Sequence, residues 1–78
     1  RTSTAAIDSL RQAVFANPDN IALIQLLSQI QADSGRVDDA ARTLRESVLK
    51  LEPENKNAAA ELQVKLGDIY AESNRNNE

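Results

Sequence analysis

The chain repeats a pattern of residues at an interval of 34, and this interval restricts its fold more than any other feature. Residues 9–15, Ser-Leu-Arg-Gln-Ala-Val-Phe, return as residues 43–49, Thr-Leu-Arg-Glu-Ser-Val-Leu, with each position identical or conservatively replaced. Ala6 and Ala40 extend the match at the same interval. A fixed period of this size is the signature of a stacked repeat array. Such arrays usually act through extended surfaces, so the pattern favours binding over catalysis.

Composition agrees with one small domain over residues 1–78, of which 41% are hydrophobic. A chain of this length leaves much of its surface exposed and is only modestly stable. The sequence has no cysteine, which excludes disulfides and thiolate metal sites but leaves the compartment open between the cytoplasm and a bacterial periplasm. It contains no apolar run near the ~20 residues of a membrane span. The absence of methionine leads us to expect that the chain is a piece of a longer protein.

Apolar residues at steps of three and four predict an all-α fold without strands. We expect four helices, at residues 3–17, 19–34, 38–51 and 55–73. The first is expected to end at Asn17-Pro18 and the third at Glu52-Pro53, because a residue before proline is driven out of the helical region. The second should stop at Gly35, which tolerates the left-handed conformation of a helix end. The expected N-terminal caps are Ser3 or Thr4, Asp19 or Asn20, and Asp38, and the fourth helix is expected to begin near Asn55.

A second repeated segment relates the second and fourth predicted helices. Residues 27–36 reappear in part at residues 66–75, an interval of 39 rather than 34. Four of the five additional residues equal about one helical turn, and we expect them to extend the fourth helix at its beginning, through residues 56–60. Asn74 takes the place of Gly35 and predicts a helix stop there. Residues 74–78 are polar and are expected to form a frayed tail.

These motifs resemble the tetratricopeptide repeat family. The family pattern is a large residue, two spacers, Leu-Gly, two spacers and Tyr in a first helix, then Ala, three spacers and a large apolar residue in a second helix, then Pro. Residues 66–70, Leu-Gly-Asp-Ile-Tyr, match the first-helix core, and residues 24–28 match it more loosely. The second-helix pattern occurs twice, in Ala40 with Leu44 and in Ala6 with Leu10. Pro18 and Pro53 follow these two helices.

The resemblance implies antiparallel helix pairs stacked as a short right-handed α-solenoid. Residues 3–17 would be the second helix of one repeat, residues 19–52 a complete repeat, and residues 55–73 the first helix of a third. The small residues Ser28, Ala40 and Ser47 would lie where two helices cross closely. Three departures stand out: Gln31 occupies the usual Tyr position, the chain has no Trp, and Pro53 comes one residue late.

Residues suited to catalysis or to cofactor binding are scarce. The chain has no histidine, which excludes nucleophilic dyads that use one. Gly35 and Gly67 are the only glycines, so no phosphate-binding loop is present. The net charge of −3 with scattered Lys and Arg disfavours nucleic acid, which requires a clustered basic face. A metal site combining Asp33 with Asp68 or Glu72 is disfavoured. We therefore expect a non-enzyme without cofactors.

The resemblance also implies a concave groove lined by first helices, here residues 19–34 and 56–73. Its expected lining consists of Gln25, Gln29, Asp33, Lys65, Asp68 and Glu72. Relatives that bind the carboxylate tail of chaperones use Lys, Arg and Asn at such positions, and Lys65 alone cannot replace them. The expected partner is a protein or peptide that is neutral or basic, and a chaperone carboxylate is disfavoured. The alternative is that these six side chains are only solvated.

Two other functions stay open at the level of sequence. The fourth predicted helix has no partner helix after it, so two copies could pair through its apolar residues Leu62, Leu66, Ile69 and Tyr70. This predicts a homodimer or other self-association. The chain could instead be a structural spacer that holds other domains of a larger protein and has no ligand in the groove.

Overall fold

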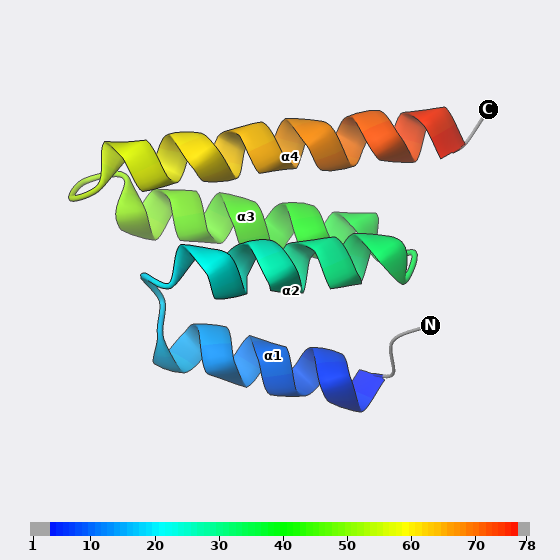
Figure 1. Ribbon diagram of the computed structural model, residues 1–78, viewed down its shortest axis with the longest axis horizontal. Helices are drawn as coiled ribbons and strands as arrows, with labels where there is room; N and C mark the ends of the chain where they lie inside the picture. Colours follow the sequence, from blue (N-terminus) through cyan, green and yellow to red (C-terminus); the bar gives the residue numbers. More distant parts are fainter. Residues whose placement is uncertain (1–3, 77–78) are drawn as a thin grey trace.

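Four helices lie side by side, each running opposite to the one before it (Figure 1). The computed structural model describes the backbone of residues 4–76 and the side chains of residues 4–74. The helices are α1 (Thr4–Ala16), α2 (Ile21–Asp33), α3 (Val37–Leu51) and α4 (Lys56–Asn76), and no strand occurs between residues 4 and 76. The all-helical fold class is therefore confirmed. The described part measures 38 × 27 × 15 Å.

Local signals position three of the helix ends as expected. Asn20 caps α2, its side-chain oxygen accepting from the Leu23 amide at 3.2 Å. Asn55 caps α4 in the same way, through the Ala58 amide at 3.1 Å. Gly35 follows the end of α2 with a φ of +84°, and the Arg36 amide donates to the Gln31 carbonyl at 2.8 Å. This pair of features is the Schellman arrangement, in which the left-handed residue satisfies the last helical carbonyls.

Two predicted helix ends are wrong. Asp38 does not cap α3, because the turn after Gly35 leads directly into a helix that begins at Val37, and Asp38 and Asp39 lie in its first turn. There their charges oppose the positive helix end. Asn74 does not stop α4, which continues through Asn76, and no residue other than glycine has a positive φ within residues 4–76. No glycine or proline follows Ser73 to end the helix. The rest of the predicted tail, residues 77 and 78, lies outside the described residues, as does the predicted cap Ser3.

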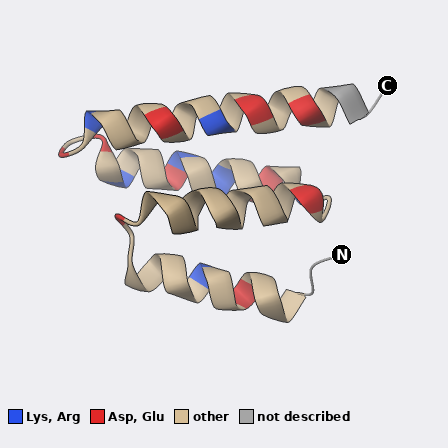
Figure 2. Cartoon of the chain, viewed as in Figure 1, with Lys and Arg blue, Asp and Glu red and all other residues tan. Residues whose placement is uncertain are grey.

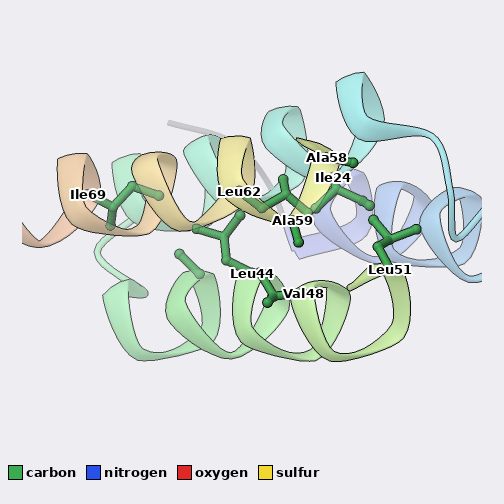
Figure 3. Packing of buried hydrophobic residues seen from close by; sticks show 9 residues of the cluster. Ile24, Leu44, Val48, Leu51, Ala58, Ala59, Leu62 and Ile69 are labelled. Atoms are coloured by element: carbon green, nitrogen blue, oxygen red, sulfur yellow. The ribbon is translucent and has the colours of Figure 1, made fainter. Parts of the chain in front are cut away.

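The core lies between α2, α3 and α4 (Figure 3). Figure 3 shows Leu44 and Val48 of α3 facing Leu62 of α4, with Ile24 of α2 beside them. The full cluster comprises Ile24, Ala40, Leu44, Val48, Leu51, Ala58, Ala59, Leu62 and Ile69. The additional turn at the start of α4 is confirmed, since α4 begins at Lys56 and buries Ala58 and Ala59.

Small and polar residues are buried on α2 and α3, which pack against each other. Ser28, Ala40 and Ser47 are all buried, as predicted for a close approach of the two helices. Gln31 is also buried, and the Thr43 hydroxyl donates to its side-chain oxygen at 2.8 Å. A buried amide is costly unless it is hydrogen-bonded, so Thr43 supplies the partner that the departure from Tyr requires.

α1 is attached at one edge of the molecule. It packs against α2, whereas α3 packs against both α2 and α4, and α2 also contacts α4. Ile7 is the buried residue of α1, and Val14 packs partly against the core. Leu26 of α2 is 48% exposed. No helix within residues 4–76 combines the length and hydrophobicity needed to cross a bilayer.

Candidate binding cavity between α2 and α4

A cavity of about 320 Å³ lies where the second half of α2 and the second half of α4 approach the turn between α2 and α3. Ile69, Ala32 and Val37 give it an apolar part, and Gly35 forms an edge without a side chain. Its polar lining comes from Gln29, Asp33, Glu72 and Ser73. The Schellman turn at Gly35 brings the start of α3 close to the end of α2, and this turn therefore shapes one wall.

Hydrogen bonds hold the polar wall in place. Lys65 of α4 donates from Nζ to the side-chain oxygen of Gln29 at 2.5 Å, which links the two helices. Gln29 in turn donates from Nε2 to Asp33 Oδ1 at 2.8 Å, one turn further along α2. The Gln29 side-chain oxygen thus already accepts a hydrogen bond from Lys65. The groups left for a ligand include the second amide hydrogen of Gln29 and the second oxygen of Asp33. Lys65 and Gln29 are half-buried, which limits the alternative positions of both side chains.

The cavity is acidic. Its described lining contains the carboxylates of Asp33 and Glu72 and no Lys or Arg. Acidic residues are spread along α4 and reach the end of α2, as Figure 2 shows. Lys65 lies beside the cavity, where its ammonium group is engaged by Gln29. The site can accept hydrogen bonds and attract positive charge, and it has little with which to hold an anion.

The structure brings together part of the predicted groove. Gln29, Asp33 and Glu72 line the cavity, and Lys65 is tied to its wall. Gln25 and Asp68 do not line it. Each lies one turn earlier on its helix than Gln29 or Glu72, while the cavity is confined to the end near the α2–α3 turn. Hydrogen bonds from two glutamines to a ligand are therefore not available in this cavity.

The predicted self-association residues divide into two pairs. Leu62 and Ile69 are buried in the core, at 0% and 2% exposure, so they are not available to another chain. Leu66 is half-buried against that core. Tyr70 is 39% exposed, and Arg45 of α3 donates to its hydroxyl at 3.1 Å. Any surface on α4 for a second copy thus includes Leu66 and Tyr70 but neither Leu62 nor Ile69.

A larger cavity, of about 570 Å³, lies on another side of the molecule between α1 and α3. Its floor includes Leu27, Gln31 and Ser47, and its lining includes the basic residues Arg11, Arg42 and Lys50 and the acidic residues Asp8, Asp39 and Glu46. These charges balance, and two of the basic residues already have acidic neighbours on their own helix, at 3.9 Å in each pair. Sequence reasoning missed this cavity. The sequence gives one indication of this cavity. The 34-residue interval makes α1 and α3 equivalent helices, and α2 lies between them in the chain.

Within the described part of the chain, no group of three or more acidic side chains is arranged to hold a metal ion. Comparison of the sequence with models of known protein families, with curated proteins and with solved structures gave no significant match.

Proposed function

We propose that this chain is a repeat scaffold of the tetratricopeptide type, without catalytic activity, that binds a neutral or basic segment of a partner protein between its first helices. The observation that carries the proposal is the cavity between α2 and α4, whose described lining has two carboxylates and no cation. The similar segments that lie 39 residues apart make these two helices the first helices of successive repeats.

The packing supports the repeat assignment. α2 contacts both α3 and α4, as a first helix does when it touches its own second helix and the next first helix. The small residues Ser28, Ala40 and Ser47 are buried where α2 and α3 cross. The one-turn extension at the start of α4 accounts for four of the five residues by which the intervals of 34 and 39 differ.

The chemistry of the lining supports a basic segment over an acidic tail. Asp33 and Glu72 would attract a lysine or arginine side chain, while the apolar part of the cavity accommodates the aliphatic stem of that side chain. Lys65 does not line the cavity, and its ammonium group donates to Gln29 beside it. A chaperone carboxylate tail is therefore disfavoured by the position of Lys65 as well as by the composition of the groove.

Fluorescence anisotropy with two labelled nonapeptides, both blocked at the termini, tests the proposal. One alternates Gly with Lys and the other alternates Gly with Glu. We expect the lysine peptide to bind more tightly, and the double variant Asp33→Asn, Glu72→Gln to weaken its binding about 2- to 30-fold, since each exposed ion pair contributes roughly 0.2–1 kcal/mol.

The matched control is the double variant Glu52→Gln, Glu54→Gln. It removes the same two negative charges at exposed positions after α3, outside the cavity. This control should bind the lysine peptide like the unsubstituted chain at about 0.15 M salt, where distant surface charges are screened. Equal losses in both double variants would show that only net charge matters, and tighter binding of the glutamate peptide would contradict the proposed ligand.

A role as a structural spacer stays a prediction. In that case neither peptide binds measurably, and the cavity variant changes no property of the chain other than its charge.

A further inference from the structure

The outward face of α1 corresponds to a face of α3 that is covered inside the molecule, where α3 packs against α2 and α4. Leu44 and Ser47 of α3 are 0% and 7% exposed. Their counterparts 34 residues earlier are Leu10 and Ala13, which are only half-buried. α1 thus carries the residues of a helix that is covered on this side, but within residues 4–76 it contacts no helix other than α2.

The outward face of α4 corresponds in the same way to the face of α2 that is buried against α3. Leu27, Ser28 and Gln31 are 2%, 0% and 4% exposed. Their counterparts 39 residues later are Leu66, which is half-buried, and Gly67 and Tyr70, which are exposed. Among the described residues, two faces are therefore left uncovered, and their counterparts lie on helices that pack against each other.

Gly67 is the most informative residue of the α4 face. Glycine is among the poorest helix formers, yet Gly67 lies in the middle of α4 with helical backbone. A Cβ atom added there would meet nothing within 4 Å, so packing among the described residues does not require a glycine. Its counterpart Ser28 is a small residue that is fully buried on α2, the helix that α3 packs against. A helix that crosses α4 at Gly67 would explain the small residue.

We propose that a second copy of this chain supplies that helix, with α1 of one copy covering α4 of the next as α3 covers α2. Leu10 and Ala13 would pack against Leu66 and Gly67. Ser9 would lie opposite Tyr70, because their counterparts Thr43 and Gln31 are hydrogen-bonded at 2.8 Å. Figure 1 shows α1 and α4 at opposite edges of the molecule. The contact is therefore head-to-tail, and it builds open chains of copies rather than closed dimers.

This arrangement goes beyond the groove ligand and differs from pairing through Leu62 and Ile69, which the core already covers. It also predicts which substitutions matter. Residues on the buried side of α4 can affect assembly only by unfolding the chain, whereas Gly67 can affect it while the fold is kept.

Sedimentation equilibrium of the 78-residue chain over a wide range of concentration is the first measurement. The average mass should rise above the 8.5 kDa of one chain as concentration increases. A size series at one position supplies the test and its control. Gly67→Ser, which copies Ser28, should assemble like the unsubstituted chain, and Gly67→Leu should raise the dissociation constant at least about tenfold because it overfills the crossing. Circular dichroism of dilute samples should show equal or greater helix stability for both variants.

A mixing experiment then separates head-to-tail contact from symmetric pairing. Leu10→Lys places a charge on the α1 face, and Gly67→Leu blocks the α4 face. Each variant alone keeps one intact face and should remain monomeric, whereas an equimolar mixture should give a 1:1 complex. Ser9→Arg, at an exposed position on α1, replaces Leu10→Lys if the latter loses helix content. A chain that stays monomeric at every concentration, or a Leu10→Lys variant that still self-associates while folded, would overturn the proposal.

Discussion

Two leucines at equivalent positions of the repeat should differ sharply in their contribution to stability. Leu44 on α3 is fully buried in the core, while Leu10 on α1, 34 residues earlier, is half-buried and is not part of the cluster. Both leucines lie inside an α-helix, so a change of either one to alanine alters helix propensity by a similar small amount. The two substitutions therefore isolate the effect of burial.

The expected magnitudes follow from the two environments. Replacing a fully buried leucine by alanine loses the transfer free energy of the side chain and leaves a cavity, at a cost of about 3–5 kcal/mol. For the half-buried Leu10 we expect roughly 1 kcal/mol, because about half of the side chain stays in water and little cavity forms. A chain of 78 residues has a free energy of unfolding of roughly 4–12 kcal/mol. Leu44→Ala should therefore remove a large share of the total, and Leu10→Ala a small one.

Urea unfolding followed by circular dichroism at low protein concentration measures the difference. Thermal melts give a second measurement. Because each kcal/mol shifts the melting temperature of a domain of this size by about 4–8 °C, the two variants should melt at least about 8 °C apart. If Leu10→Ala is as destabilising as Leu44→Ala, α1 belongs to the core as fully as α3 does, and the description of α1 as an edge helix is wrong. An unchanged slope of the free energy against urea would show that the substitutions alter stability and not the surface exposed on unfolding.

The other predictions concern single positions. The two glycines should respond to alanine with opposite signs: Gly35→Ala, at a φ of +84°, should destabilise the chain by about 1–2 kcal/mol, and Gly67→Ala should stabilise it by up to about 1 kcal/mol in thermal melts. Asn55→Ala removes the cap of α4 and should cost about 1 kcal/mol by the same measurement. Thr43→Val leaves the buried oxygen of Gln31 without its donor and should cost about 1–3 kcal/mol, most of which a second change of Gln31 to leucine should restore in a double-mutant cycle.

The helices themselves could be predicted because their signals are local. The six buried residues of α3 follow the steps of three and four residues that predict a helix. The cap at Asn20 lies where the turn residues indicate, and α4 begins next to Asn55 as expected. The end of α4 could not be predicted in this way. Asn74 resembles Gly35 in sequence position, but asparagine also fits a helix, and nothing after it forces the chain to leave one.

Burial could be predicted less well than helices, because it depends on neighbours that the repeat does not encode. Gln31 and Tyr70 occupy equivalent positions, yet Gln31 is buried since α3 covers it, and Tyr70 is exposed because no helix in the described chain lies over it. The cavity between α1 and α3 could not be predicted for the same reason. It depends on the distance between two helices that are not packed against each other. The groove residues were only partly identified for a related reason. The helix pattern gives the face of α2 or α4, but the turn at Gly35 decides where along that face a cavity forms.

Stability and assembly of this chain should be linked, because the open faces belong to the same helices that limit its core. α1 is fastened chiefly through Ile7, and Tyr70 on the second half of α4 is 39% exposed. A second copy bound to either face favours the folded state by mass action, so the melting temperature should rise with protein concentration if head-to-tail contacts form. Gly67→Leu should remove this dependence while leaving the dilute-limit melting temperature equal or higher. A melting temperature that rises equally in both chains would assign the effect to another surface, since only the unsubstituted chain can accept a helix across Gly67.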